Sequence, residues 1–438
     1  MKHFTPVILS SLFCCVLLYS GVIKPLGKNS FSSLIPNSEI RFLHGTVTSN
    51  PVKSSSGKTY SVAFSPLEVA AGKKDLSSIY KKSSSYGELT LYIPSEIVEA
   101  YYPGKLYSLS TKKNVQNSAN NFTNSLLQVY GGESQFPIIE NGLSLTISGS
   151  YLERENGEAA FYLEKIFSHG YKSKIQYYRA YSRLFLKRIL YNWGECGGLL
   201  LALLSGSKEY TSLEIQENFS KAGLAHVLAL SGMHLSIFAS LPGRFFKKKS
   251  EMFSLIVVFL FVWFAGLSPS LLRALISMII SLVCKKLSIK TNLLGILSLS
   301  FLIQISIFPS HIFNYGFILS YAALVGLELG QKMFLPWLCK VFPKKISSDL
   351  SASLGAQTVT SPITLLGFGT CSPIGIIASV IVSPIATIFL SFGVFAVILS
   401  MVLPFLLKPI GCIMSLIYAI LTWIVDFFSK FPIIQISN

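Results

Sequence analysis

The chain has 438 residues, of which 51% are hydrophobic and 13% are charged, and its formal net charge is +17 at pH 7. Because soluble domains carry about 25% charged residues, this composition excludes an ordinary soluble enzyme and is typical of a polytopic membrane protein. The positive charge leaves three interpretations open: a nucleic-acid partner, an anionic membrane surface, or the enrichment of Lys and Arg in cytoplasmic loops. The seven cysteines form no CxxC pair, and their odd number argues against a disulfide framework.

The N-terminal region, residues 1–40, begins with an apolar segment over residues 7–23 that follows Lys2. A cleaved signal peptide is one interpretation, but Tyr19-Ser20-Gly21 is a poor cleavage site. We therefore predict an uncleaved transmembrane helix, followed by a linker.

Residues 41–170 have a different character, because polar and apolar residues alternate in short runs between turn residues. These runs are 41–48, 58–64, 87–93, 104–110 and 143–151. Alternation with period two predicts strands, and about five short antiparallel strands in this length favour a small OB-like β-barrel. Periodicity alone does not separate a barrel from a sandwich.

Residues 171–194 place Lys and Arg on one side of a predicted helix and aromatic residues with Leu and Ile on the other. This composition predicts an amphipathic helix at the membrane interface. The alternative is a linker helix that packs on the β domain.

Residues 195–438 contain a series of apolar segments, and a membrane span needs about 20 apolar residues, so the shorter segments are candidates for re-entrant or broken helices. The segments are 195–206, 223–242, 252–267, 271–284, 292–308, 312–330, 350–367, 372–400 and 410–428.

Basic residues occur in every second loop of this region, and the alternate loops at 268–270, 309–312 and 367–372 contain no Lys or Arg. The basic loops carry Arg244 with Lys247, Lys248 and Lys249, then Lys285, Lys286 and Lys290, then Lys332, Lys340, Lys344 and Lys345. The positive-inside rule makes these loops cytoplasmic. The β domain is then extracytoplasmic, and the predicted location is the inner (cytoplasmic) membrane.

The segment 226–234 places His226, Ser231 and His234 inside an apolar stretch. Imidazole is costly in a lipid-embedded helix, so it is expected to face a partner helix or a water-filled path. On one continuous helix, His234 points away from a side of small residues that suits close helix packing. The small residues are Ala225, Ala229, Gly232, Ser236 and Ala239. The two histidines would lie about 80° apart and two turns along the helix, which disfavours a shared metal ion, and a structural hydrogen-bonding role remains an alternative.

Arg273 and Gln357 are two further polar residues in apolar surroundings. Arg273 lies at the end of a segment far from the basic loops, where packing or function must hold it. Arginine binds phosphate in a bidentate manner, so a phosphate or carboxylate contact is one interpretation, and snorkelling to the interface is the other. Gln357 precedes Pro362, and together with Pro384 this proline predicts kinked or interrupted helices.

Four ordered sequence elements resemble those of the competence-protein family of membrane channels, often called ComEC. They are Gly206-Ser207-Lys208 with Phe219 and the run Gly223–His234, then Ser268–Ala274, then Phe313–Ser320, then Ala356–Pro362. The resemblance covers nearly the whole chain and implies an N-terminal helix, an OB-like domain and a multi-helix channel. It also implies conduction of single-stranded DNA across the inner membrane during natural transformation.

On this resemblance the chain is not expected to be an enzyme or to need a cofactor. The residues expected to line the DNA path are Lys208, His226, Ser231, His234, Arg273 and Gln357. Those expected to support helix packing are Gly223, Gly232, Pro269, Gly316 and Pro362. The expected partners are single-stranded DNA, membrane lipid, a periplasmic DNA receptor, a cytoplasmic ATPase or helicase, and a second copy of the chain.

The chain departs from the family pattern in several places. Ser207 and Lys208 stand where Asp and Arg are usual, and Asn314 and Ile318 replace frequent Asp and Gln. We expect this form to lack the metallo-β-lactamase-like domain of longer members, so that any nuclease step lies elsewhere or does not occur. These departures keep open a transporter of another polar or anionic solute, and a membrane anchor that recruits a partner through its β domain.

Overall fold

The computed structural model describes residues 5–19, 31–54, 57–72, 79–101, 137–153, 159–171, 173–245 and 250–435. Within it the chain forms two compact units. The unit that we call the β unit comprises Lys28–Leu201 and Ser207–Tyr210. The unit that we call the helical unit comprises Met1–Gly27, Ala202–Gly206 and Thr211–Asn438.

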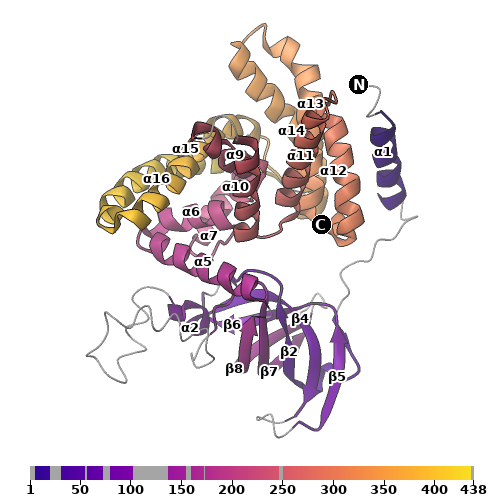
Figure 1. Ribbon diagram of the computed structural model, residues 1–438, viewed down its shortest axis with the longest axis vertical. Helices are drawn as coiled ribbons and strands as arrows, with labels where there is room; N and C mark the ends of the chain where they lie inside the picture. The colour runs from indigo at the N-terminus through magenta and orange to yellow at the C-terminus, as the bar shows by residue number, and fades with distance from the viewer. Residues whose placement is uncertain are drawn as a thin grey trace. The chain divides into compact units, whose positions relative to one another are not determined.

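The β unit is built on one sheet of antiparallel and parallel pairs (Figure 1). Its strands are β1 (Ser32–Ser33), β2 (Ile40–Val47), β3 (Val52–Lys53), β4 (Thr59–Ala71), β5 (Lys81–Tyr86), β6 (Leu89–Pro94), β7 (Leu143–Glu153) and β8 (Ala159–Tyr171). Five of them pair in a closed circuit, because β4 pairs with β2 and β6, β2 with β7, β7 with β8, and β8 with β6. The β6–β8 pair is parallel and the other four pairs are antiparallel.

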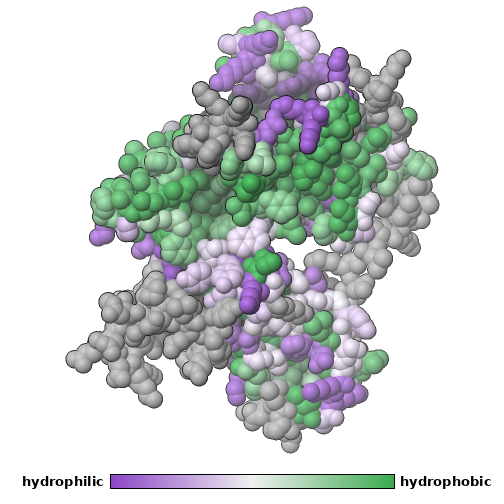
Figure 2. Space-filling view, viewed as in Figure 1, coloured by the Kyte–Doolittle hydropathy of each residue, from purple (hydrophilic) through white to green (hydrophobic). Residues whose placement is uncertain are grey.

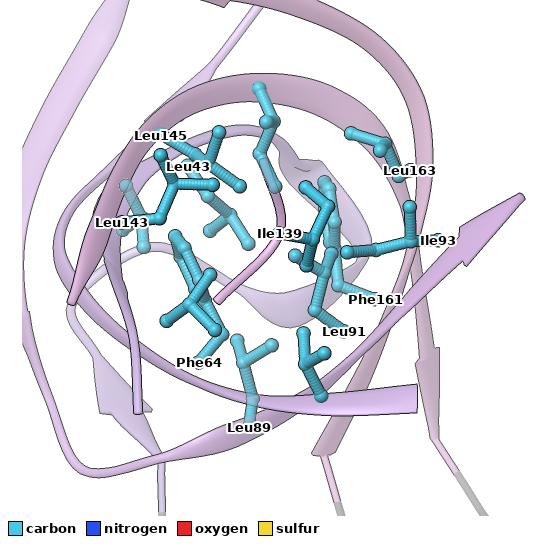
Figure 3. Close-up of a cluster of buried hydrophobic side chains, with 14 of the residues drawn as sticks. Leu43, Phe64, Leu89, Leu91, Ile93, Ile139, Leu143, Leu145, Phe161 and Leu163 are labelled. Carbon is cyan, nitrogen blue, oxygen red and sulfur yellow. The ribbon is translucent and has the colours of Figure 1, made fainter. Parts of the chain in front are cut away.

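The core of the β unit lies inside this circuit, as Figure 3 shows. Side chains alternate between buried and partly exposed along the first part of β4, which is the period of two that a strand requires. Phe64, Leu91 and Phe161 have no exposed surface, and each comes from a different strand. Fully burying a side chain of this size contributes about 1.5–3 kcal/mol. The apolar residues that alternate along these strands therefore supply the core and stabilise it.

The structure confirms strands in four of the five predicted runs, namely those that contain β2, β4, β6 and β7. The fifth predicted run, 104–110, lies outside the described residues. Two longer strands, β5 and β8, were not predicted. In β8 the pairing with β7 shifts register twice, between Thr146 and Ile147 and between Ser148 and Gly149. Each shift places an extra residue on β8 and breaks the alternation that sequence analysis relies on.

Helix α5 (Lys174–Tyr191) belongs to the β unit and packs one face on the rest of that unit. Ser173 caps its first turn, and Ala180 and Leu184 are buried beside Ile138. Arg183 and Lys187, two of the basic residues that suggested contact with lipid headgroups, are instead buried. This face of α5 therefore matches the alternative of a helix packed on the β domain.

The helical unit contains helices of very different lengths (Figure 1). They are α1 (Thr5–Tyr19), α7 (Leu213–Lys221), α8 (Ala225–Leu228), α9 (Gly232–Phe245), α10 (Ser250–Ala265), α11 (Pro269–Lys286), α12 (Leu293–Ile307), α13 (Tyr315–Leu338), α14 (Lys344–Phe368), α15 (Gly375–Val402) and α16 (Leu407–Ser429). A further helix, α6 (Gly194–Ser205), runs from the β unit into this unit. Among the described residues, three segments are long and apolar enough to cross a membrane: Tyr315–Leu338, Gly375–Val402 and Pro404–Ser429.

The surface of the helical unit matches a membrane location, because Figure 2 shows a broad hydrophobic area over α15 and α16. On α15 the exposed residues include Ile388 and Phe395, and on α16 they include Leu416 and Trp423. Such an area is far larger than the isolated apolar residues of a soluble surface. The turn between α13 and α14, which carries Lys340 and Lys344, is hydrophilic in the same view.

Helices α13 and α14 approach each other through glycine. A Cβ atom on Gly330 would lie 2.5 Å from the Cα of Gly355, and one on Gly355 would overlap the backbone of Gly326 and Gly330. Gly326 and Gly330 are spaced as in a GxxxG motif, which allows membrane helices to pack backbone against backbone. Helix α14 runs through Pro362 and α15 runs through Pro384, so neither helix is interrupted at its proline.

Helix α1 belongs to the helical unit. It contains most of the predicted N-terminal span, and Cys14 and Cys15 pack against the buried cluster of Phe301, Phe317 and Tyr321. These cysteines act as small apolar packing residues, as free thiols commonly do.

Candidate functional site

The segment around His226 and His234 is broken rather than a single helix, so the predicted continuous helix is wrong. Helix α8 ends at Leu228, Ala229 adopts an extended conformation, and α9 begins only at Gly232. Apolar composition predicted the continuous helix, but composition does not report backbone direction. His226 and His234 therefore lie on two different helices, and the angle of about 80° predicted between them on one helix does not apply.

His234 lies at the start of α9 and is fully buried. Its Nδ1 atom accepts a hydrogen bond from the Ser231 backbone N–H at 3.2 Å and lies 3.1 Å from the Ser231 hydroxyl. This contact closes the break and fixes the first turn of α9. Its second ring nitrogen, Nε2, is buried and has no hydrogen-bond partner among the described residues.

Arg273 lies beside the same turn, although it comes from α11. Ser268 caps this helix and Pro269 is its first residue, where the missing N–H costs nothing. The Ser270 hydroxyl donates to the Leu230 carbonyl at 2.5 Å and so ties α11 to the break. The guanidinium of Arg273 then lies against Gly232: a Cβ atom there would be 3.3 Å from Arg273 Nη2.

Arg273 is 7% exposed, and its buried Nε has no hydrogen-bond partner among the described residues. Buried arginine is normally paired, because an unpaired charge in a poorly solvated site is costly. Arg273 and the buried ring of His234 therefore flank the first turn of α9 as two polar groups with unused hydrogen-bonding capacity.

A chain of hydrogen bonds links α12 and α13 to the start of α11. Tyr321 donates to Gln304 Oε1 at 3.0 Å and lies 3.1 Å from the Ser300 hydroxyl. Gln304 donates in turn to the Pro269 carbonyl at 2.9 Å, and its Nε2 lies 3.3 Å from His311 Nδ1. The chain fixes the first residue of α11, and with it the position of Arg273. The sequence analysis did not select Ser300, Gln304 or Tyr321, although Ser300 and Gln304 are spaced i, i+4 in an apolar helix and signal one polar face.

Gln357 belongs to a second cluster and does not contact Arg273. Its Nε2 donates to the Ser372 carbonyl at 2.7 Å, just before α15. Gly223 and Gly375 meet there, since a Cβ atom on Gly223 would lie 2.8 Å from the Gly375 Cα. Gly223 also has φ of +73°, which side chains rarely adopt, so two constraints require glycine here. His226 is exposed and makes a hydrogen bond to the Gly223 backbone, so it belongs to this cluster.

The two remaining packing residues behave differently. Gly316 donates its N–H to Asn314 Oδ1 at 2.8 Å, which makes it part of the N-cap of α13 rather than of a helix interface. Pro362 lies in the last two turns of α14.

Lys208 lies in the β unit and is half-buried. The segment that carries it, Ser207–Tyr210, is held there by buried ion pairs. Lys187 of α5 lies 2.6 Å from Glu140 Oε1 and 2.8 Å from Glu209 Oε1. The Ser207 hydroxyl donates to the same Glu209 oxygen at 2.7 Å.

Glu140 also lies 2.9 Å from Arg183 Nε, so two acids and two bases share one buried site. Burial by itself would raise the pKa of Glu140, but Arg183 and Lys187 outweigh it and lower the pKa to about 2. Burial likewise opposes the charge of Lys187, but Glu140 and Glu209 raise its pKa. Glu140 and Lys187 are therefore charged at neutral pH, and the cluster pairs two acidic side chains with two basic ones.

The four sequence elements that resemble the competence proteins all fall within one family model. The model for the family described as "Competence protein" matches residues 203–438, which is more than half of the chain. The chain belongs to the competence protein family. Arg273, His234 and Gln357 all lie inside the matched region.

Individual relatives are distant. The chain is 28% identical to ComE operon protein 3 of Bacillus subtilis over 178 residues, which is 39% of this chain and 21% of the relative. It is 29% identical to an uncharacterized protein of Aquifex aeolicus over 245 residues, 54% of this chain and 55% of the relative. A further uncharacterized protein, from Mycoplasma genitalium, is 28% identical over 184 residues, 41% of this chain and 47% of the relative. The matches thus span between about a fifth and about half of the relatives' lengths. No solved structure matches the chain.

Proposed function

We propose that this membrane protein conducts single-stranded DNA across the inner membrane during natural transformation, and that it does so without catalysing a reaction. The observation that carries the proposal is the pair of polar side chains, Arg273 and His234, buried together at the first turn of α9 in a region that belongs to the competence family. A DNA conduit needs cationic and hydrogen-bonding groups that meet the phosphate backbone, and these groups have capacity to spare.

Helix direction supports an extracytoplasmic position for this site. Helices α11 and α14 have Lys285 and Lys344 at their ends toward the basic loops, whereas α9, α11 and α13 all begin at neutral loops. Arg273 lies in the second turn of α11, near its neutral end. Under the positive-inside rule the site then faces the side from which DNA arrives.

We further propose that the β unit is an OB-like barrel on the extracytoplasmic side. Its closed circuit of five strands, with one parallel pair between β6 and β8, supports this proposal. OB folds commonly bind single-stranded nucleic acid through exposed aromatic residues and basic side chains. Tyr86 and Tyr162 are exposed aromatic residues of this unit, and Lys81 and Lys82 lie on β5 near Tyr86.

The departures from the family pattern are chemically mild where the structure describes them. Ser207 stands at a usual aspartate position, but it donates to Glu209, so a carboxylate still occupies the neighbourhood. Asn314 also replaces aspartate, and it caps α13 as aspartate would. These contacts favour DNA over the second candidate, another polar or anionic solute. The remaining argument for that candidate is Lys208, which stands where arginine is usual.

The proposed partners are a periplasmic DNA receptor, a cytoplasmic ATPase or helicase, and a second copy of the chain. The test is deletion of the gene in its host, followed by measurement of labelled DNA on each side of the inner membrane. We expect DNA to accumulate outside the membrane. Normal entry of DNA in the deletion strain would contradict the proposal and favour another solute.

Orientation is tested separately, because it does not depend on the substrate. Reporter tags after Lys286 or Lys345 are expected to be cytoplasmic, and tags within residues 45–165 are expected to be extracytoplasmic. A cytoplasmic signal from the β unit would overturn the proposed orientation.

A further inference from the structure

Arg273 presents a charge for which the described part of the protein supplies no counterion. Arg273 is 7% exposed, and its Nε finds no acceptor or carboxylate among the described residues. A cation held in this way points to an anion that the folded chain does not itself contain.

The guanidinium is aimed at a helix N-terminus. Its Nη2 lies beside the Cα of Gly232, the first residue of α9. The first intrahelical N–H of α9 is that of Leu235, which bonds to the Ser231 carbonyl at 3.4 Å, so the N–H groups of Gly232, Met233 and His234 precede it. Such groups carry a partial positive charge that favours an anion.

The local side chains keep this position accessible and polar. Ser231, Gly232 and Met233 are half-buried, whereas Arg273 and His234 behind them are buried. His234 Nδ1 accepts a hydrogen bond from the N–H of Ser231, the residue just before α9.

We infer that the first turn of α9 and the guanidinium of Arg273 form a seat for one phosphate group. If the ligand is DNA, the inference rests on the proposed function, and the bound group is one phosphodiester of the strand. Phosphate is the class that matches best, because arginine binds it through two parallel hydrogen bonds while backbone N–H groups take a third oxygen. A single seat holds the strand weakly, which suits a conduit.

The decisive comparison is between Gly232→Asp and Gly232→Ala. Aspartate places a carboxylate at the helix N-terminus beside Arg273, where it takes the place of the bound phosphate. Alanine adds the same Cβ without charge, and that atom meets only the flexible end of Arg273 at 3.3 Å and the Ala274 Cβ at 3.7 Å. Arg273→Gln removes the charge, and Arg273→Lys retains it without the bidentate geometry.

The full chain is purified in a maltoside detergent, which contains no phosphate, and three probes are added separately: inorganic phosphate, oligothymidylate and phosphatidylglycerol. Binding of fluorescent oligothymidylate is expected to be within about twofold of wild type in Gly232→Ala. It is expected to fall about tenfold or more in Gly232→Asp and Arg273→Gln, since a hydrogen bond to a charged group contributes about 1.5–3 kcal/mol. Without ligand, Gly232→Asp is expected to melt at a higher temperature than Gly232→Ala, because its carboxylate supplies the missing counterion.

Equal oligothymidylate binding by Gly232→Asp and Gly232→Ala would overturn the seat and leave the conduit proposal standing. If wild type fails to bind oligothymidylate but inorganic phosphate still stabilises Gly232→Ala and not Gly232→Asp, the seat stands and the DNA proposal fails. Selective stabilisation by phosphatidylglycerol identifies a lipid headgroup as the source of the phosphate. No difference between the two variants with any probe refutes the seat outright, and this comparison does not depend on whether Arg273→Gln folds.

Discussion

Replacing Lys187 by Met should loosen the contact between α5 and the rest of the β unit, because Lys187 is the base that pairs with both Glu140 and Glu209. Methionine has a similar length and removes the charge without leaving a large hole. The four-charge cluster of Glu140, Glu209, Arg183 and Lys187 would then carry one excess negative charge in a site where Glu140 is 2% exposed. The change therefore tests an interaction inside one unit, independent of any transported substrate.

The magnitude follows from the charge that is left behind. Removing one partner from a buried ion pair costs about 3–5 kcal/mol, because the other charge stays desolvated. A second estimate agrees: the pKa of Glu140 falls from its ordinary 4.5 to about 2, which at 1.36 kcal/mol per pH unit corresponds to about 3 kcal/mol. Because Arg183 makes the largest single contribution to lowering this pKa, the expected loss for Lys187→Met is at the lower end of the first range, about 3 kcal/mol.

Hydrogen exchange of the full chain in detergent measures this loss locally, because it reports the opening free energy of each segment. A loss of about 3 kcal/mol should speed exchange in α5 and β7 by about a hundredfold. Lys221→Met is the matched control, since Lys221 forms an exposed i, i+4 pair with Glu217 at 3.3 Å. Such pairs contribute only about 0.3–0.5 kcal/mol, so exchange in this control should change little.

The double variant Lys187→Met with Glu209→Gln restores charge balance and should recover much of the protection. Acid should act in the same direction as Lys187→Met. The pKa of Glu140 is lowered in the folded state, so its contribution is fully present above pH 4.5 and is lost as the pH falls toward about 2. If Lys187→Met exchanges like Lys221→Met, or if the double variant is no better than the single one, the reasoning about buried charge is refuted.

Three further results are expected. Gly355→Ala should lower the amount of folded protein strongly, because its Cβ would overlap the backbone of α13, whereas Gly170→Ala, which meets nothing within 4 Å, should not, as thermal melting would show. Alanine at Tyr86 or Tyr162 should weaken binding of single-stranded DNA by about 1–3 kcal/mol per stacked base at low salt, and unchanged affinity would reduce the β unit to a scaffold. His234→Ala should leave protein abundance near normal while DNA entry falls sharply, and a loss of abundance instead would mark the histidine as purely structural.

The strands of the β unit were predictable wherever one residue in two is buried, as along β4. The prediction failed on β8, where two register shifts against β7 interrupt the alternation. It failed on β5 for another reason, because Lys81–Tyr86 has only Ser85 buried and therefore carries no apolar periodicity. Both strands are held by backbone pairing, which residue types report poorly.

In the helical unit, the sequence located the polar residues but not their neighbours. Apolar composition gave approximate helix positions, and Gly326 with Gly330 carried a readable packing signal that the analysis overlooked. The break before Gly232 was missed because every residue around it is compatible with a helix except for the Ser231-Gly232 pair. The contact between Gly232 and Arg273 joins residues far apart in sequence, and nothing short of the fold brings them together.

The broken segment explains why a buried arginine can be useful here. In a continuous helix the N–H groups of Gly232, Met233 and His234 would be used within the helix, and Arg273 would meet only apolar side chains. The break redirects these N–H groups, Ser270 holds α11 against the break through the Leu230 carbonyl, and the Gln304 chain fixes the start of α11. Each of these contacts buries polar groups, which costs free energy that a purely structural helix pair would avoid. Because they all converge on the first turn of α9 and leave Arg273 unpaired, the arrangement is better explained by a ligand than by stability.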